Sequence, residues 1–316
     1  MSLAGHFWTV VPTVSGYLAP PRLPRPTPWE TTVHDPLRGP VRLTGDLHER
    51  ADAKGLVVVI PGLGGNTRSP YARRAARDLL RCGWSALLMP QRGGDLRGED
   101  YYHASLSADL HAAVGSPAVR RYQRVCCLGF SMGGHVTLRF AADPPPAHVV
   151  AVAAICSPID LFAAQRFFDQ SSRWLYRWHV LRALKKIYRE VHARGLAPTP
   201  LPDLMSARSI RDWDTMAIVP RFDFRDANDY YARASVAPHL HALAVPSLLL
   251  LSTQDPIISA EDVRRAMPDR TPNLNVEWHA SGGHVSFPRR FGLIDRVDHW
   301  FERAVERTRD DTSRAS

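Results

Sequence analysis

A serine stands between two glycines at Gly129-Phe130-Ser131-Met132-Gly133, directly after an apolar run at residues 125–128 and directly before a helix-like stretch. The order of strand, sharp turn and helix is typical of a nucleophile elbow. A serine hydroxyl becomes a useful nucleophile only when it is exposed beside a base and faces oxyanion donors. Side chains at the two glycine positions would collide with the neighbouring strand and helix. We therefore predict that Ser131 is a nucleophile; the alternative is a serine in a plain strand-to-helix loop.

Asp255 and His284 follow Ser131 in the chain, each on a loop after an expected strand. Asp255 comes shortly after the strongly apolar run of residues 245–251, and His284 follows a short strand expected over residues 273–279. A glycine pair before His284 lets its loop bend back over the sheet. The chain order Ser, Asp, His is that of the α/β-hydrolases and not of chymotrypsin-like or subtilisin-like proteases. We predict Asp255 as the triad acid and His284 as the base.

Both assignments have competing explanations. An Asp-Pro pair after a strand is a common turn, and the chain has 14 His, most of which are expected to be structural or exposed. Asp160 is a second candidate acid, because it follows the apolar strand expected over residues 149–155. We favour Asp255, since it lies on the last strand before the strand that leads to the histidine.

A glycine-rich loop at residues 61–66 follows the apolar run of residues 55–60 and suggests an oxyanion hole. Such a site needs one backbone N–H after the nucleophile and one from the loop after an early strand. We assign these donors to Met132 and Leu63. Gly62 and Phe130 are also expected to contact the substrate. Binding of a phosphate is disfavoured, because no Gly-Lys-Ser/Thr follows and a dinucleotide fingerprint does not fit the spacing.

Composition indicates an ordinary globular protein of 316 residues, with 45% hydrophobic and 22% charged residues. The formal net charge is +9. Arginine is spread along the whole chain and no nucleic-acid motif accompanies it, so we expect no nucleic-acid partner. Attraction to acidic substrates or anionic lipid surfaces fits the charge better.

The four cysteines are too few for a disulfide framework and have no metal-ligand spacing. Reduced cysteines suit the cytoplasm. Residues 1–20 lack the features of a signal peptide, and no apolar stretch is long enough to cross a bilayer. We therefore expect a cytoplasmic protein without a metal site.

Apolar runs that alternate with amphipathic stretches predict a mostly parallel sheet covered by helices on both faces. The expected strands are residues 55–61, 84–89, 125–128, 149–155, 245–251 and 273–279, with an antiparallel pair over residues 31–47 at a sheet edge. The expected helices are residues 69–82, 104–114, a helix after Ser131, and 289–307. The alternation indicates the α/β fold class, with an α/β-hydrolase core in two parts, residues 1–157 and 241–316.

Residues 158–240 interrupt the alternation, because a single crossover needs far fewer residues. Within this insertion residues 161–194 have a helical pattern rich in aromatic and basic residues. We expect a helical lid over Ser131, in which Phe162 and Trp174 contact an acyl or alkyl group. The alternative is that these aromatic residues only pack the insertion onto the core. The basic amphipathic pattern also suits weak contact with a membrane surface.

Several motifs carry a family resemblance. They are residues 62–67, residues 129–134, Tyr230-Tyr231 with Ser235 inside residues 226–235, Gly282-Gly283-His284-Val285-Ser286-Phe287, and the start at residues 5–9. Together they resemble the YheT-like α/β-hydrolases, bacterial relatives of eukaryotic membrane-anchored lipid esterases, over nearly the whole chain.

The resemblance implies a carboxylic-ester hydrolase that acts on acyl esters, with Ser131, Asp255 and His284 as its triad. The chemistry expected from the residues is two-step acyl transfer through an acyl-serine, and it needs no cofactor. Two alternatives stay open. An acyltransferase would use the same triad, and a binding protein would keep the fold without catalysis. The sequence does not indicate the oligomeric state.

Overall fold

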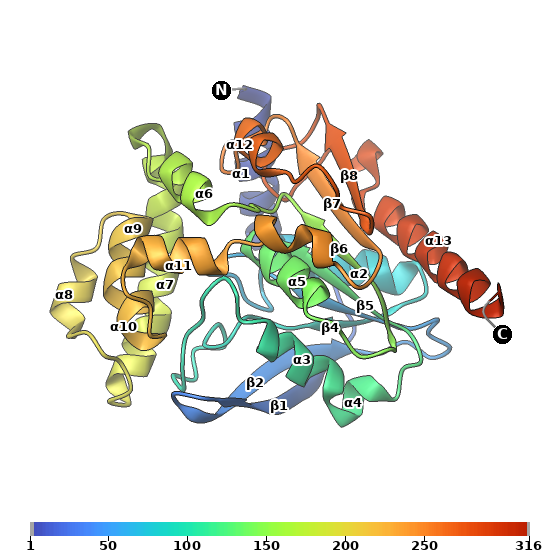
Figure 1. The fold of residues 1–316 in the computed structure, drawn as a ribbon, viewed down its shortest axis with the longest axis horizontal. Helices are drawn as coiled ribbons and strands as arrows, with labels where there is room; N and C mark the ends of the chain where they lie inside the picture. The colour runs from blue at the N-terminus through green and yellow to red at the C-terminus, as the bar shows by residue number, and fades with distance from the viewer. Residues whose placement is uncertain (1–2, 315–316) are drawn as a thin grey trace.

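The computed structural model describes residues 3–314, and the side chains of residues 3–306. In this part of the chain eight strands form one sheet, in the spatial order β1-β2-β4-β3-β5-β6-β7-β8 (Figure 1). The pairs β1–β2 and β2–β4 are antiparallel, and all other neighbours are parallel. The strands are β1 (Thr27–Asp35), β2 (Gly39–His48), β3 (Leu56–Ile60), β4 (Ser85–Leu88), β5 (Val125–Phe130), β6 (Val149–Ile155), β7 (Ser247–Ser252) and β8 (Leu274–His279). The predicted fold class is confirmed.

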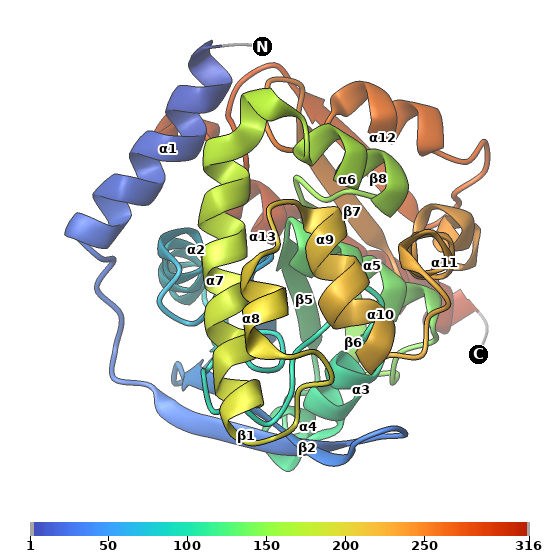
Figure 2. The ribbon, with the colours of Figure 1, turned by 90° about the vertical axis from the view of Figure 1, so that its left-hand side faces the viewer.

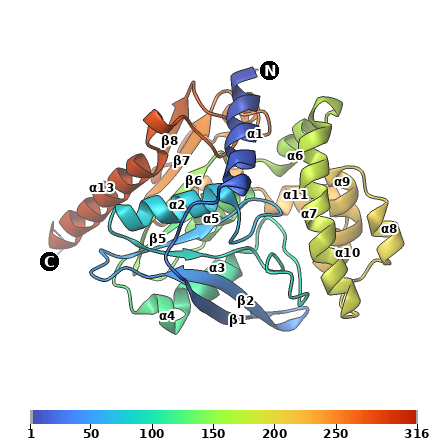
Figure 3. The ribbon, with the colours of Figure 1, turned by 180° about the vertical axis from the view of Figure 1, so that it is seen from behind.

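Helices cover both faces of this sheet, as the views from front and back show (Figures 1 and 3). Residues of α3 and α5 belong to the apolar cluster on one face, and residues of α2 and α13 to the cluster on the other. The helices outside the segment between β6 and β7 are α1 (Leu3–Leu18), α2 (Pro70–Arg81), α3 (Ser107–Gly115), α4 (Pro117–Arg120), α5 (Met132–Ala142), α12 (Ala260–Ala266), the short η4 (Arg289–Phe291) and α13 (Leu293–Arg314).

The parallel strands owe their place in the sheet to apolar runs that are buried on both faces. β3 reads Leu-Val-Val-Val-Ile and is buried throughout. The helix that follows, α2, begins at Pro70, whose fixed φ suits the first helical position. Ser69 occupies the N-cap position, but its hydroxyl accepts a hydrogen bond from the backbone N–H of Asn66 and caps no helix amide. It therefore stabilises the loop before the helix.

The segment between β6 and β7 forms most of a separate helical layer (Figure 2). Its elements are α6 (Leu161–Phe168), η1 (Ser171–Arg173), α7 (Trp174–Ala193), α8 (Leu201–Met205), α9 (Ile210–Trp213), the π-helical η2 (Asp214–Ile218), α10 (Val219–Arg221), α11 (Ala227–Ala234) and η3 (Ala237–Ala242). These helices share a third apolar cluster with Tyr101 and Tyr102 of the core. The domain limits at residues 158 and 240 stay predictions, and η3 packs against α5.

A buried network of charges ties this helical layer to the sheet. Arg92, which follows β4, has its Nη1 atom 2.7 Å from Asp35 and 2.8 Å from Asp100, and its Nε atom donates to Asp109 at 3.0 Å. Arg221 of α10 reaches the same carboxylates, at 2.6 Å from Asp100 and 3.1 Å from Asp35. Because all five side chains are buried, loss of one partner would leave an uncompensated charge.

The sequence pattern predicts no element at the start of the chain, yet residues 3–18 form the helix α1. It packs on α2 so closely that a Cβ atom on Gly16 would lie 2.4 Å from the Cβ atom of Pro70. Arg74 Nη2 donates a hydrogen bond to the Pro12 carbonyl at 2.7 Å. These contacts place α1 beside the carboxyl ends of the parallel strands.

Candidate active site

Ser131 lies on a strained turn between β5 and α5. Its φ is +53° and its ψ is −122°, a backbone conformation that non-glycine residues rarely adopt. The turn is closely packed: a Cβ atom on Gly133 would lie 2.4 Å from the Ile60 carbonyl oxygen, and one on Gly129 would lie 2.3 Å from that of Gly133. Such strain persists only where the surroundings enforce it, and it often marks a functional residue.

Asp255 and His284 contact each other directly. His284 Nδ1 is 2.8 Å from Asp255 Oδ2, and both side chains are largely buried. The other carboxylate oxygen, Oδ1, accepts the backbone N–H groups of Ile257 at 2.8 Å and Ile258 at 3.0 Å. The carboxylate is therefore fixed, and its bond to Nδ1 selects the tautomer in which Nε2 is free to accept a proton.

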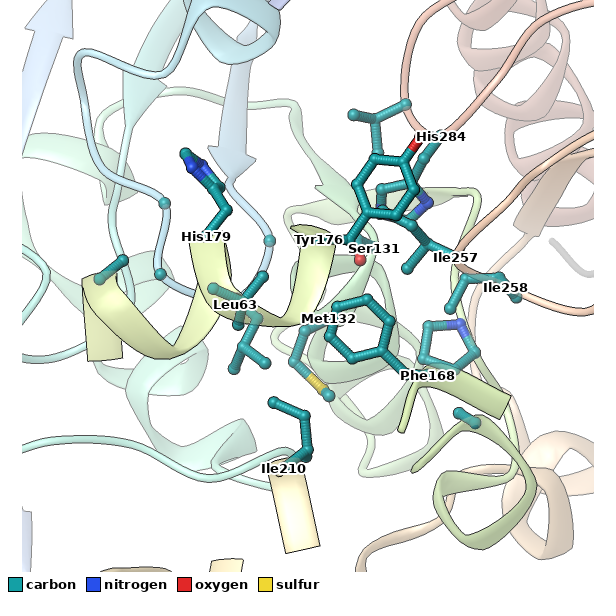
Figure 4. Close-up of a pocket in the computed structure, with 18 of the residues that line it drawn as sticks. Leu63, Ser131, Met132, Phe168, Tyr176, His179, Ile210, Ile257, Ile258 and His284 are labelled. Carbon is teal, nitrogen blue, oxygen red and sulfur yellow. The ribbon is translucent and has the colours of Figure 1, made fainter. Parts of the chain in front are cut away.

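Ser131 and the ring of His284 line the same cavity (Figure 4). Within the described side chains the Ser131 hydroxyl makes no hydrogen bond, to His284 or to another group. Hydrogen bonds between a nucleophile and its base are often long in an empty site and tighten when substrate binds. The structure thus brings the three sequence-predicted residues to one place, at the ends of β5, β7 and β8.

The loop of His284 is held from behind by α1. The backbone N–H of His284 donates to Thr9 Oγ1 at 2.8 Å, and that hydroxyl donates in turn to the Gly5 carbonyl at 2.8 Å. A Cβ atom on Gly283 would lie 2.3 Å from the Gly5 oxygen. Thr9 was not among the predicted site residues, because its contact with His284 joins positions 275 residues apart.

Leu63 and Met132, the predicted oxyanion donors, both line the cavity. Among the hydrogen bonds of the described residues neither backbone N–H has an acceptor. The amides on either side of Leu63 are fixed instead: Gly62 N–H donates to Tyr71 Oη at 2.9 Å, and Gly64 N–H donates to Tyr102 Oη at 2.6 Å. The glycine-rich loop is thereby held open with one amide left for a ligand.

Asp160, the second candidate acid, has a different position. It is the N-cap residue of α6, and its Oδ1 atom accepts the backbone N–H groups of Phe162 at 2.8 Å and Ala163 at 3.1 Å. Capping of this kind stabilises a helix start. Because Asp255 is the carboxylate bonded to His284, the geometry favours Asp255 over Asp160 as the partner of the imidazole.

The cavity beside Ser131 has a volume of about 400 Å³, within the range of roughly 300–1,000 Å³ typical of small-molecule sites. Its walls are mainly apolar (Figure 4). The core contributes Leu63, Met132, Ile257 and Ile258, and the helical layer contributes Leu161, Phe168, Ile210, Trp213 and Ile218. An alkyl or acyl chain is the kind of group that such walls bind by exclusion of water.

The four predicted substrate contacts have different outcomes. Gly62 lines the cavity. Phe130 does not, because the strand that carries it buries its ring against Tyr71, with 1% of the side chain exposed. Phe162 and Trp174 also lie outside the cavity, 41% and 61% exposed. These three residues do not line the cavity in the structure, and their contact with substrate stays a prediction.

Helical phase explains why Phe162 faces away from the cavity, whereas Trp174 misses it because of its place at the start of α7. On α6 the cavity residues are Leu161, Ala164, Gln165 and Phe168, spaced as one face of a helix. Phe162 lies off that face, and its ring contacts Tyr231 edge-on. On α7 the cavity residues are Leu175, Tyr176, Trp178, His179, Val180 and Ala183. Trp174 shares a face with Trp178 but lies one turn earlier, at the outer start of the helix. The sequence pattern of a helix shows which residues share a face, but it does not show which part of the protein that face contacts.

Tyr176 is a cavity residue that the sequence did not single out. It lines the same cavity as Ser131 and His284 (Figure 4). Its hydroxyl is 2.7 Å from His6 Nδ1, and the two rings are stacked at 5.8 Å. Burial, together with the charge of Asp255, raises the pKa of Tyr176. The contact links α7 to α1 across the mouth of the cavity.

Asp214 is a buried carboxyl in another wall of the cavity. It begins the π-helical turn η2, and Tyr231 donates its hydroxyl to Asp214 Oδ2 at 2.7 Å. Burial raises the pKa of Asp214 to about 8, against the opposing effect of the Tyr231 hydrogen bond. Asp214 is therefore largely protonated near neutral pH. Its neutral form avoids the cost of an unpaired charge in an apolar wall.

Among the described residues, no group of three or more His, Cys, Asp or Glu could hold a metal ion. No helix in the described part of the chain combines the length and apolarity needed to cross a membrane.

The fold and the position of these side chains agree with comparison to known proteins. A family model described as alpha/beta hydrolase fold matches residues 55–290, which is most of the chain. The protein therefore belongs to the α/β-hydrolase family. The strand order and the turn at Ser131 are the features that this membership explains.

The individual relatives carry esterase- and lipase-type names, which makes the protein a hydrolase of YheT-like type. "Putative esterase YheT" of Escherichia coli (strain K12) is 28% identical over 81% of this chain and 76% of that protein. "Phospholipase ABHD3" of Mus musculus is 23% identical, over 81% of this chain and 65% of its own length. "Monoacylglycerol lipase ABHD2" of Danio rerio is 22% identical, over 90% of this chain and 71% of its own length.

Solved structures agree on the fold. The esterase Pf2001 of Pyrococcus furiosus superimposes with a TM-score of 0.57 at 17% identity, over 88% of this chain and 92% of that one. A bacterial membrane phospholipase A superimposes with a TM-score of 0.56 at 16% identity, over 96% of this chain and 95% of that one.

Proposed function

We propose that the protein is a serine carboxylic-ester hydrolase that acts on acyl esters through an acyl-serine intermediate. Ser131 is the nucleophile, His284 the general base and acid, and Asp255 the group that orients the imidazole. The observation that carries the proposal is the 2.8 Å bond between Asp255 and His284 in the wall of the cavity that also exposes the strained Ser131.

In the proposed reaction His284 Nε2 takes the proton of the Ser131 hydroxyl as Oγ attacks the ester carbonyl. The N–H groups of Leu63 and Met132 donate to the oxyanion, and the positive end of the α5 dipole favours its charge. The imidazolium then protonates the departing alcohol, so that the acyl group stays on Ser131. Water attacks this ester with His284 again as base, which releases the acid and restores the serine.

The apolar cavity supports an acyl chain as the main substrate element. Burial of one methylene contributes about 0.8 kcal/mol, so kcat/KM should rise up to about fourfold for each added methylene while the chain still fits. The relatives named as phospholipase and monoacylglycerol lipase are in keeping with acyl esters of lipids.

The test is hydrolysis of a series of p-nitrophenyl esters from acetate to palmitate. Ser131→Ala should lower kcat/KM at least about a thousandfold, because the nucleophile is lost. Ser69→Ala is the matched control: Ser69 also lines the cavity, but its hydroxyl bonds to Asn66 in the loop before α2 and to Tyr71, and not to the triad. We expect it to keep most of the activity. Hydrolysis at the wild-type rate by folded Ser131→Ala would disprove the proposal.

A further inference from the structure

The exposed face of α1 is a continuous apolar stripe. Phe7, Val10, Val11, Val14, Tyr17 and Leu18 are between 37 and 82% exposed. Their spacing puts them on one side of the helix, while Gly5, Thr9 and Gly16 on the opposite side are buried against the protein. A surface helix normally turns its polar side to water. α1 contains no charged residue at all, so its exposed face is suited to an apolar environment.

The stripe continues across the mouth of the cavity onto α7. Trp174, Leu175 and Trp178 at the start of α7 are also exposed. α1 and α7 lie next to each other (Figure 2), joined by the contact of His6 with Tyr176. Val10, Val14 and Tyr17 from the one helix, and Leu175 and Trp178 from the other, border the cavity itself. A ligand that enters between the helices therefore passes through the apolar surface.

Charge and residue type on α7 indicate what this surface meets. The helix carries five Arg or Lys and one Glu. Three of the basic residues, Arg182, Lys186 and Arg189, are exposed, whereas Arg177 and Lys185 donate to backbone carbonyls of the helical layer. Arg182 stacks over the ring of Trp178, with 5.6 Å between guanidinium and ring centroid. Tryptophans and basic side chains beside an apolar helix face are typical of proteins that lie in the headgroup region of a bilayer. A protein partner would explain the stripe, but not its opening onto a cavity for an acyl chain.

We propose that the exposed faces of α1 and of the start of α7 form a docking surface for membranes that contain anionic lipids. The apolar stripe of α1 lies in the boundary between headgroups and acyl chains, and the exposed basic residues of α7, Arg182, Lys186 and Arg189, face lipid phosphates. The mouth of the cavity then opens toward the bilayer, so that a lipid ester enters without crossing water. The link to catalysis rests on the proposed function, whereas the docking itself does not.

Flotation of the full chain with vesicles tests this surface. We expect the protein to float with vesicles of equal parts phosphatidylglycerol and phosphatidylcholine, and more weakly with phosphatidylcholine alone. Added salt should reduce the difference, because it screens the phosphates from the basic side chains. Ser131→Ala should float as the wild type does, so that a failed ester-hydrolysis proposal would not change this result.

A triple variant, Phe7→Gln with Val11→Gln and Leu18→Gln, removes apolar surface that does not line the cavity. Gln is a good helix former, so α1 should be retained. We expect at least tenfold weaker partitioning, with unchanged hydrolysis of p-nitrophenyl acetate. Leu37→Gln is the matched control, because Leu37 is equally exposed but lies in the turn between β1 and β2. It should partition as the wild type does.

Three results would overturn the proposal. One is a wild-type protein that floats with neither type of vesicle. Another is a triple variant that floats as well as the wild type. The third is a wild-type protein that is a dimer and does not float with vesicles, together with a triple variant that is a monomer. The stripe would then be an interface between two copies of the chain.

Discussion

The two sides of the cavity are held in place by different forces. On the Ser131 side the residues stand at strand ends, and their positions are set by backbone geometry: a positive φ at Ser131 and the amides that hold the Asp255 carboxylate. On the opposite side α6, α7, α9 and η2 contribute side chains held by apolar packing and by buried polar groups such as Arg221 and Asp214. The residues at the strand ends are fixed by the backbone itself. The side chains of the helical layer are placed by the faces that the helices turn toward the cavity.

We therefore expect the Ser131 side of the cavity to carry out the reaction and the helical side to bind the substrate. A change on the strand-end side should alter the rate while the protein stays folded, because the strands carry the fold. A change in the polar groups of the helical side should alter stability first. Three sets of substitutions test that division, in order of decreasing effect.

Asp255→Asn should have the largest effect. The amide would no longer hold His284 in the tautomer that leaves Nε2 free, and kcat/KM for p-nitrophenyl butyrate should fall by about 10³–10⁴. Asp160→Asn is the control, since asparagine caps a helix as well as aspartate does, and it should stay within a few-fold of the wild type. A larger loss for Asp160→Asn than for Asp255→Asn would reverse the assignment of the acid.

Arg92→Met should destabilise the fold by about 3–5 kcal/mol, because it leaves the buried Asp109 without its cation, while Asp35 and Asp100 keep Arg221. The measurement is the free energy of unfolding in urea. Arg97→Met removes an arginine that is half exposed and has only long contacts, 3.6 and 3.9 Å, with carboxylates. It should change stability by less than about 1 kcal/mol. If the two variants lost the same amount of unfolding free energy, the buried charge network would not be what holds the helical layer to the sheet.

Asp214→Asn should change how stability depends on pH. The folded pKa of Asp214 is raised to about 8, whereas an unfolded aspartate titrates near 3.9. Between these values the folded state binds the extra proton, so the stability from Asp214 is full below pH 4 and is lost as pH rises toward 8. Relative to the variant, the wild type should lose up to about 1.4 kcal/mol per pH unit. Urea unfolding at pH 5, 6 and 7 measures this, and parallel curves would contradict it.

The parts of the molecule that sequence predicts are those fixed by local pattern. Runs such as residues 149–155 and the antiparallel pair at the sheet edge match the observed strands, because buried strands leave little choice of residue. The glycines around Ser131 and the chain order of the three predicted triad residues indicated where these residues would meet. Their catalytic roles stay predictions.

The parts that the sequence did not predict depend on contacts between distant segments. The exposed face of Phe162 and Trp174 is decided by how α6 and α7 turn against the core, which periodicity leaves open. The helix α1 has an apolar face toward water, so its pattern lacks the usual signal of a surface helix. The partners of Arg92 come from β1, from the loop that holds Asp100 and from α3, which only the assembled sheet brings together.

The central claim is that Ser131 is a nucleophile activated by the Asp255–His284 pair. The most direct measurement is the intact mass of the protein after reaction with a fluorophosphonate, followed by peptide mapping of the adduct. The account predicts one phosphonyl group per chain, located on Ser131, and much slower labelling of His284→Ala. An unlabelled folded protein, or an adduct on another residue that survives Ser131→Ala, would contradict it.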